Sequence, residues 1–212
     1  MFGNARMKVT AVIVTRGTSP LNFSMYRDML DSLNVPGVDE VIVWDNRKAA
    51  KDVKVFGRYA GAMLAKNEYV YVQDDDCVTD VNAVIKSARP GKVVCNVPVD
   101  RRPEYAGTGV TLMGWGSVFA KSLIMPSFDE YLRRWPQDEL FERECDRLFS
   151  YVNRRRVALV DVGLRHLDHA HGGDRMGREA RHRADLVEMR TRARMLDEQF
   201  THARESLGVQ VV

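Results

Sequence analysis

The run Tyr69-Val70-Tyr71-Val72-Gln73-Asp74-Asp75-Asp76 decides the fold, because a stretch rich in β-forming residues ends directly in three carboxylates. Valine and tyrosine at this density predict a buried central strand. Ligands of open α/β sheets bind just beyond the carboxyl ends of the strands. The sequence therefore predicts a binding site at Asp74, Asp75 and Asp76, called the acidic triplet below.

The acidic triplet has two interpretations. Adjacent carboxylates repel one another unless a cation lies between them, and a set of hard oxygen ligands suits Mg²⁺ or Mn²⁺, which most often bridges to phosphates. In the alternative, the triplet is a solvated turn that caps a helix over Val78–Ser87, with Asp76 near the helix N-terminus. The rest of the chain favours the metal site.

The residues before the triplet predict alternating strands and helices. Apolar runs of strand length and stretches with helical periodicity follow one another: a strand over Lys8–Thr15, a helix over Phe23–Leu33, a strand over Glu40–Trp44 and a helix over Arg58–Lys66. This order and spacing favour parallel pairing with right-handed crossovers. We therefore predict an α/β fold with a mostly parallel central sheet.

The residues after the triplet continue the pattern less regularly. The expected elements are a strand over Lys92–Val99, a Gly-interrupted loop and strand over Thr108–Phe119, a helix over Asp138–Val152, a strand over Arg156–Val162, a His- and Gly-rich loop over His166–Gly173 and a charged helix over Glu179–Arg204. We predict one domain over residues 1–178 and a helical tail over residues 179–212. The tail could pack on the domain or form a homodimer, although its heptad pattern is not clean.

Composition bounds the class of protein. The chain has 212 residues, of which 45% are hydrophobic, and its net charge of +3 is too small to indicate a nucleic-acid partner. Cys77, Cys95 and Cys145 have no metal-like spacing and are typical of buried free thiols in a reducing compartment. Residues 1–8 lack the apolar core of a signal peptide, and no apolar run approaches the roughly 18 residues of a membrane span. We expect a soluble, cytoplasmic protein.

The sequence resembles nucleotide-sugar-dependent glycosyltransferases of the GT-A fold, either family-2-like or exostosin-like, over roughly Val9–His171. The pieces that carry the resemblance occur in the order of that family: Thr15-Arg16 after the first strand, Asp45 after the second, Arg58 ahead of the third, the acidic triplet as the DxD motif, Gly114-Trp115-Gly116-Ser117-Val118-Phe119 as the acceptor loop, Glu144-Cys145-Asp146 as the acidic catalytic region and His171 as the C-terminal histidine. The resemblance implies a Rossmann-like sheet flanked by helices.

The resemblance also implies a role for each of these residues. The donor nucleotide sugar would bind Thr15, Arg16, Asp45, Arg58, Asp74 and Asp75; the acceptor would bind Gly114, Trp115 and Gly116; Mn²⁺ or Mg²⁺ would bind Asp76 with His171 or His169; and Asp146 or Glu144 would be catalytic. The chain departs from the family in being short and in having Cys145 inside the acidic pair. This leaves Asp138, Glu144 and Asp146 open as the catalytic carboxylate.

Some of these residues also have plain structural interpretations. Asp146 lies among apolar helix positions, where a carboxylate is costly to bury unless it is paired or functional. It could instead form a salt bridge to Arg143 or Arg147 on the helix surface. Trp115 lies between two glycines and could stack on a sugar ring or fill a tight turn of the core. The histidines could be chance residues of a surface loop.

The function that this pattern indicates is metal-dependent transfer of a sugar from a nucleoside-diphosphate sugar, with UDP as the first choice, to an acceptor hydroxyl. The acceptor could be a glycan or, at lower weight, a hydroxylated base in DNA. Inversion would follow if Asp146 is a general base, whereas the exostosin-like resemblance implies retention. A nucleotidyltransferase is an alternative, although Arg16–Pro20 holds a single Gly where such enzymes have a Gly-rich loop. A non-catalytic binding module of the same fold is another.

Overall fold

A computed structural model describes residues 7–15, 23–104, 111–166 and 184–196. Its centre is a six-stranded sheet with the order β2-β1-β3-β6-β5-β7. The strands are β1 (Val9–Thr15), β2 (Val38–Asp45), β3 (Tyr69–Asp74), β5 (Val93–Asn96), β6 (Ser117–Ala120) and β7 (Val157–Val160). Strand β6 runs antiparallel to its neighbours β3 and β5, and the remaining pairs are parallel. The predicted mostly parallel α/β sheet is confirmed.

The burial of the strands follows their place in the sheet. Every residue of β1 is buried, as expected for a parallel strand that is covered on both faces. Strand β2 pairs with β1 alone among the described strands, and its side chains alternate between half-buried and exposed. The apolar run of β1 is thus the sequence signal of a central strand, whereas the equally apolar residues 41–44 of β2 do not mark it as an edge strand.

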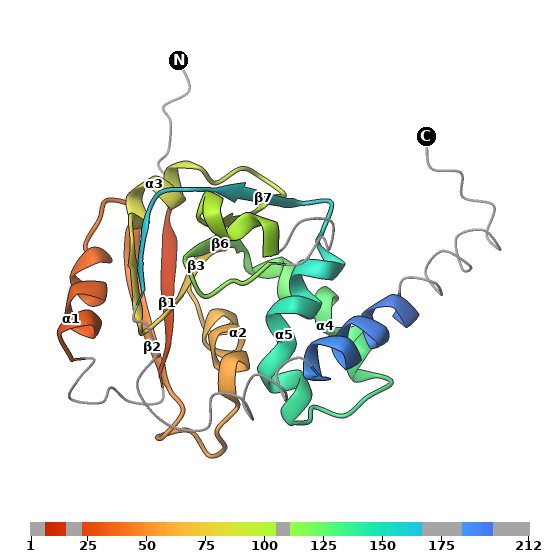
Figure 1. Ribbon diagram of the computed structural model, residues 1–212. Coiled ribbons are helices and arrows are strands. Elements are labelled where there is room, and N and C mark those ends of the chain that lie inside the picture. Colours follow the sequence, from red (N-terminus) through yellow and green to blue (C-terminus); the bar gives the residue numbers. More distant parts are fainter. Residues whose placement is uncertain (1–6, 16–22, 105–110, 167–183, 197–212) are drawn as a thin grey trace.

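Helices cover both faces of the sheet (Figure 1). On one face, α1 (Phe23–Ser32) and α3 (Val81–Lys86) contribute to a smaller apolar cluster. On the other face, α2 (Gly57–Met63), α4 (Ile124–Leu132), α5 (Glu139–Val152) and a helix over residues 184–196 contribute to a larger one. The molecule therefore has three layers, with the larger core between the sheet and α5.

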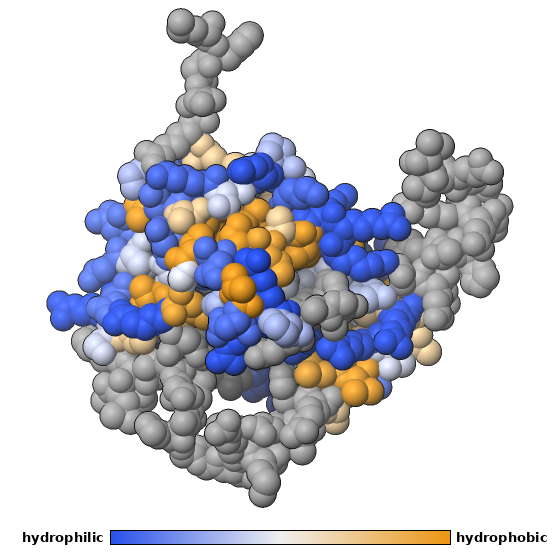
Figure 2. Space-filling view, turned by 45° about the horizontal axis from the view of Figure 1, so that its top comes forward, coloured by the Kyte–Doolittle hydropathy of each residue, from blue (hydrophilic) through white to orange (hydrophobic). Residues whose placement is uncertain are grey.

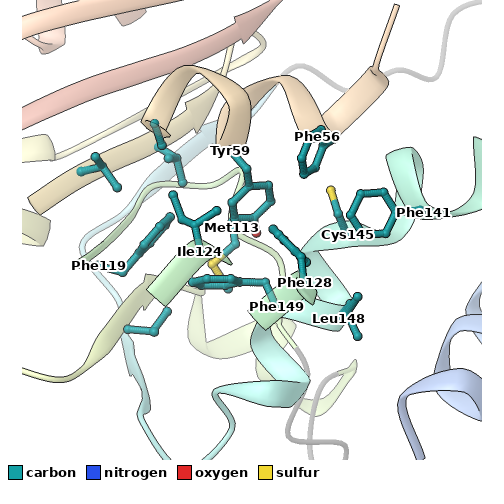
Figure 3. Close-up of a cluster of buried hydrophobic side chains, with 14 of the residues drawn as sticks. Phe56, Tyr59, Met113, Phe119, Ile124, Phe128, Phe141, Cys145, Leu148 and Phe149 are labelled. Carbon is teal, nitrogen blue, oxygen red and sulfur yellow. The ribbon is translucent and has the colours of Figure 1, made fainter. Parts of the chain in front are cut away.

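The larger core is rich in aromatic rings (Figure 3). Phe128 is fully buried, and its ring centroid lies 5.0 Å from that of Tyr59, 5.3 Å from that of Phe141 and 5.7 Å from that of Phe56. The ring centroids of Phe119 on β6 and Phe149 on α5 are 4.8 Å apart. This cluster fixes α2 against α5, which matters for the site because both helices carry charged residues toward β3.

The helix over residues 184–196 lies within the stretch expected to be a tail, and it packs on the domain. Met189, Ala193 and Leu196 are buried in the larger cluster. Arg192 Nη1 donates a hydrogen bond of 2.7 Å to the Tyr131 hydroxyl. These three side chains are therefore covered by their own chain, whereas Val187 and Met195 of the same helix are exposed, and the homodimer through it stays a prediction.

The structure differs from the sequence analysis directly after the triplet. Residues Cys77–Thr79 form a short strand, β4, which pairs antiparallel with β8 (Leu164–His166). The following helix α3 begins at Val81, and its cap is Asp80, whose Oδ1 accepts a hydrogen bond of 2.9 Å from the Ala83 amide. The alternative in which Asp76 caps a helix from Val78 is therefore wrong.

The remaining expectations concern the thiols and the surface. Cys77, Cys95 and Cys145 are free and buried, as predicted. Within the described residues, no helix has both the length and the apolar character needed to cross a bilayer. Figure 2 shows an exposed apolar patch surrounded by hydrophilic residues on the face that is turned toward the viewer. Helix α4 is an element that the sequence analysis did not predict.

Candidate functional site

The site lies where the parallel strands β1, β2 and β3 end together. Thr15 is in register with Asp45 of β2, and Val14 is in register with Asp74 of β3. The Thr15 hydroxyl donates a hydrogen bond to Asp75 Oδ2, so the ends of β1 and β3 are joined by side chains as well as by the ladder. The structure thus brings together Thr15, Asp45 and the acidic triplet, whose three carboxylates are all half-buried.

Arg58 reaches this edge because α2 lies very close to the sheet. A Cβ at Gly57 would be 2.4 Å from Trp44 Cδ1, and a Cβ at Gly61 would be 2.7 Å from Val12 Cγ1. Side chains at these positions would push the helix outward. The adjacent Arg58 is 1% exposed, and its Nη2 donates a hydrogen bond of 2.5 Å to Asp74 Oδ1. The predicted basic residue therefore lies directly against the first carboxylate of the triplet.

Asp146 lies on the far side of the same guanidinium. Its Oδ2 accepts hydrogen bonds from Arg58 Nη1 at 2.8 Å and from the Met113 amide at 3.2 Å. Its Oδ1 accepts a hydrogen bond of 2.9 Å from the Tyr59 hydroxyl. Asp146 is 4% exposed. The alternative interpretation, a surface salt bridge of Asp146 to Arg143 or Arg147, is wrong, because Asp146 is buried and pairs with Arg58.

The two other acidic candidates of this region have different surroundings. Glu144 precedes Asp146 by two positions, so it lies about 200° away around the helix, and its Oε2 accepts a hydrogen bond of 2.9 Å from Arg147. Burial raises the pKa of Glu144 to about 7, against the opposing effect of Arg147. Asp138 caps α5, and its Oδ1 accepts a hydrogen bond of 2.9 Å from the Phe141 amide. Of the three, Asp146 is the one joined through Arg58 to the triplet.

The Arg58 guanidinium lies among four carboxylates, those of Asp74, Asp75, Asp76 and Asp146. Burial raises the pKa of Asp74 to about 6; Arg58 acts in the opposite direction, while Asp76, Asp146 and Asp75 raise it further. Burial lowers the pKa of Arg58, but Asp146 and Asp74 raise it, and the net shift is upward. The site thus holds excess negative charge that a bound cation would balance.

The donor set fits a hard divalent cation. Carboxylate oxygens are the protein ligands that Mg²⁺ and Mn²⁺ prefer, and Mg²⁺ usually takes only one or two of them together with substrate phosphates and water. Among the residues that the structure describes, no group of three or more His, Cys, Asp or Glu side chains is arranged to hold a metal ion. Asp76, predicted as the metal ligand, lies two residues past the end of β3.

The predicted acceptor loop packs directly on the triplet. The Asp74 amide donates a hydrogen bond of 2.8 Å to the Gly114 carbonyl, and a Cβ at Gly114 would lie 1.9 Å from Asp74 Oδ2. Gly116 has a φ of +99°, which favours glycine, and it lies against Tyr71 and Thr79. Trp115 is half-buried and packs against the larger core cluster. Of its two interpretations, the structure shows the core contact.

The pairing of β4 with β8 brings the C-terminal part of the domain to the triplet. Cys77, which directly follows Asp76, is in register with His166. His169 and His171, predicted as metal ligands, and Arg16, predicted to bind the donor, lie outside the described residues. Residue 166 precedes His169 and His171 by three and five positions in the sequence. Its backbone pairs with that of Cys77, the residue that follows the triplet.

Several residues at the site escaped the sequence analysis. Tyr59 adjoins Arg58 but reads as an ordinary core aromatic. Arg47 bonds both oxygens of Asp45, through Nε at 3.0 Å and Nη2 at 2.9 Å, and holds the pKa of that carboxyl below its usual range. Burial raises the pKa of the Tyr26 hydroxyl on α1, and the charges of Asp75 and Asp45 raise it further. An aromatic residue in the first turns of α1 was the available signal for Tyr26.

Comparison with known proteins gives matches at the level of structure. No protein-family model and no curated protein matches the sequence. Glucosyl-3-phosphoglycerate synthase (GpgS) from Mycobacterium tuberculosis, in complex with UDP, Mn²⁺ and glucosyl-3-phosphoglycerate, is similar over 86% of this chain and 80% of its own, with 13% identity and a TM-score of 0.53. The same enzyme with Mn²⁺, UDP-glucose and phosphoglyceric acid gives coverages of 87% and 80%, 13% identity and a TM-score of 0.52.

A third structure, S. aureus TarS, is similar over 74% of this chain at 16% identity and a TM-score of 0.46, and this chain spans 36% of it. At these identities the likeness concerns the fold alone. The sheet order, the acidic end of β3 and the agreement with GpgS over most of both chains lead to one conclusion: the chain has the GT-A fold of the nucleotide-sugar-dependent glycosyltransferases.

Proposed function

We propose that the protein is a metal-dependent glycosyltransferase that transfers a sugar from a UDP-sugar to an acceptor hydroxyl. The observation that carries the proposal is the acidic triplet at the joined ends of β1 and β3, with Asp74 held by the buried Arg58. GpgS, which shares the fold, is a synthase seen with Mn²⁺ and UDP-glucose. The triplet lies at the sheet edge where ligands of open α/β sheets bind.

We assign the donor to the edge formed by β1, β2 and β3. Thr15, Asp45, Asp74 and Asp75 line this edge, with Arg58 beneath it and Arg16 directly after β1 in the sequence. Asp76, with His169 or His171, would hold Mn²⁺ or Mg²⁺. Such a cation, when bound, stabilises the negative charge that develops on a leaving diphosphate.

We assign the acceptor to the neighbouring segment Gly114-Trp115-Gly116. Its backbone is bonded to Asp74, and Asp146 lies behind it at the Met113 amide. An acceptor hydroxyl at this segment would therefore lie beside the donor carboxylates. A glycan is the proposed acceptor class, with a hydroxylated DNA base as the second. The catalytic part predicted for Glu144 stays a prediction, for a side chain that faces Arg147.

Calorimetry with a panel of UDP-, GDP- and dTDP-glucose tests the donor site, each with and without Mn²⁺. We expect one donor to bind only with Mn²⁺, and Asp76→Ala to abolish that binding. Asp80→Ala is the matched control, because Asp80 is an exposed carboxylate four positions later that caps α3. Its loss should cost about 1 kcal/mol of stability and leave donor binding unchanged.

The outcome separates an enzyme from other uses of the fold. Mn²⁺-dependent binding together with slow hydrolysis of the same UDP-sugar supports a transferase, whereas binding without turnover in the presence of candidate acceptors supports a non-catalytic module. No binding of any donor, with or without Mn²⁺, would refute the glycosyltransferase proposal.

A further inference from the structure

A buried chain of charges links three elements that are distant in the sequence. Asp74 at the end of β3, Arg58 on α2 and Asp146 on α5 are joined by hydrogen bonds of 2.5 and 2.8 Å, one to each terminal nitrogen of the guanidinium. Arg58 is 1% exposed and Asp146 is 4% exposed. Charges buried to this extent are costly unless each is paired, so the three positions depend on one another.

The hydrogen bonds of Asp146 leave it little capacity to accept a proton from a substrate. Tyr59 donates to Oδ1, and Arg58 and the Met113 amide both donate to Oδ2, so three of the roughly four acceptor sites of the carboxylate are filled. A general base needs a lone pair within hydrogen-bond reach of the proton it abstracts. The described donors to Asp146 are a hydroxyl, a guanidinium and a backbone amide, and the side chain is buried among them.

We propose that Asp146 is a positioning residue rather than a general base: it holds the Arg58 guanidinium and, through it, the Asp74 carboxylate. Asp74 is then fixed from two sides, by Arg58 at Oδ1 and by the backbone of Gly114 beside Oδ2. The inference rests on the proposed function of the site, and it specifies which part of that site Asp146 serves.

Asp146 also sets the charge that reaches the triplet. One guanidinium is shared between two carboxylates, so this set keeps one net negative charge when all three groups are ionised. Replacing Asp146 by a neutral group leaves Arg58 paired with Asp74 alone, which lowers the negative charge beside Asp75 and Asp76. A cation bound there would be held less tightly, even though Asp146 does not touch it.

Calorimetry of UDP binding with and without Mn²⁺ tests the inference. We expect Asp146→Asn to weaken the Mn²⁺-dependent affinity for UDP by about 10- to 100-fold, the range typical of residues that lie behind a metal site and support it without touching the ion. Tyr59→Phe removes a single hydrogen bond to Asp146 and should weaken it between about twofold and fivefold. The double variant should lose less than the product of the two effects, because both act through the same carboxylate.

Glu142→Gln is the matched control. Glu142 is a buried carboxylate of the same helix whose ion pair, to Lys51 at 2.6 Å, is separate from Arg58. It should leave the affinity for UDP unchanged. A variant that is only destabilised binds with reduced stoichiometry rather than reduced affinity. Should Asp146→Asn fail to fold, Tyr59→Phe carries the test by itself.

Two results would overturn the inference in distinguishable ways. If wild-type protein fails to bind UDP with Mn²⁺, the proposed function fails and the inference fails with it. If the wild type binds and both variants bind equally well, while hydrolysis of the UDP-sugar falls about 10³-fold in Asp146→Asn, the residue acts in the chemical step. That result would remove the positioning role and leave the proposed function in place.

Discussion

Gly114→Ala is the change that tests the geometry of the triplet most directly. The new Cβ would lie 1.9 Å from Asp74 Oδ2 and 2.6 Å from its Cγ, where real Cβ contacts are at least 3.0 Å. The carboxylate must therefore move by more than about 1 Å. Its other oxygen is bonded to Arg58, so the movement also strains the buried charge chain. A misplacement of about 1 Å costs catalytic groups on the order of 100-fold.

The expected result is a loss of Mn²⁺-dependent UDP binding with most of the stability retained. Gly114 has no positive φ, so alanine meets no backbone strain. Alanine stabilises by about 0.4–1 kcal/mol through the unfolded chain, against a packing cost of about 1–3 kcal/mol. We expect the affinity for UDP with Mn²⁺ to fall about 10- to 100-fold, measured by calorimetry, with a small drop in melting temperature.

Gly91→Ala serves as the control for this experiment. Gly91 has a φ of +70° and no atom within 4 Å of its ideal Cβ, so alanine brings backbone strain of about 1–2 kcal/mol without touching the site. We expect reduced stability and unchanged UDP binding, the reverse of Gly114→Ala. Unchanged UDP affinity in Gly114→Ala would refute the reasoning that Asp74 must keep its observed position.

Three further predictions concern stability. The raised pKa of Glu144 means that the folded state binds more protons than the unfolded state between about pH 4.5 and 7, so stability falls by up to about 3 kcal/mol as the pH rises through this window. The unfolding free energy from urea titrations at pH 5 and at pH 8 should therefore differ less for Glu144→Gln than for wild type. Equal differences in the two proteins would contradict the shift. Asp138→Ala removes the cap of α5 and should lower the unfolding free energy by about 1 kcal/mol in urea titrations, with no change in UDP affinity. Phe128→Ala empties the centre of the aromatic cluster and should cost about 3–5 kcal/mol; a loss below 1 kcal/mol would show that the core can repack.

The strands and their common edge were predictable because their signals are local. The apolar runs of β1 and β2 are read from neighbouring residues, and the parallel order follows from their spacing. Since parallel strands end at one edge, the positions of Thr15, Asp45 and the triplet followed from the sequence as well. What these residues bind was a matter of resemblance rather than of pattern.

The contacts behind that edge were not predictable, because they join residues far apart in the chain. Arg58 and Asp146 are 88 positions apart, and no periodicity connects them. Local helix spacing offers Asp146 only Arg143, three positions earlier, as a partner at helical period, so it suggests a surface salt bridge as the alternative to a functional role and gives no sign of Arg58. The close approach of Gly114 to Asp74 likewise depends on packing that a glycine alone does not indicate.

The short elements show a different limit. Strand β4 has three residues and exists through its pairing with β8, 87 residues later along the chain, so nothing local marks it. Either Asp76 or Asp80 could cap the following helix as far as the sequence shows, because four acidic residues lie within seven positions. The pairing of β4 with β8 delays the helix, so that Asp80 is the cap.

The precision of the site comes from the residues beneath the carboxylates rather than from the carboxylates themselves. A strand end with three aspartates has many side-chain arrangements, and their mutual repulsion favours spreading them apart. Gly57 lets α2 approach until Arg58 reaches Asp74, and Gly114 leaves room for that carboxylate on its other side. Asp146 then keeps the Arg58 guanidinium in place, because two carboxylates offset the cost of burying this charge better than Asp74 alone would. Because Arg58 and Asp146 are buried behind the triplet, substitutions there should alter affinity for UDP and cation without removing any atom in contact with either, and that separates an organised site from a merely acidic one.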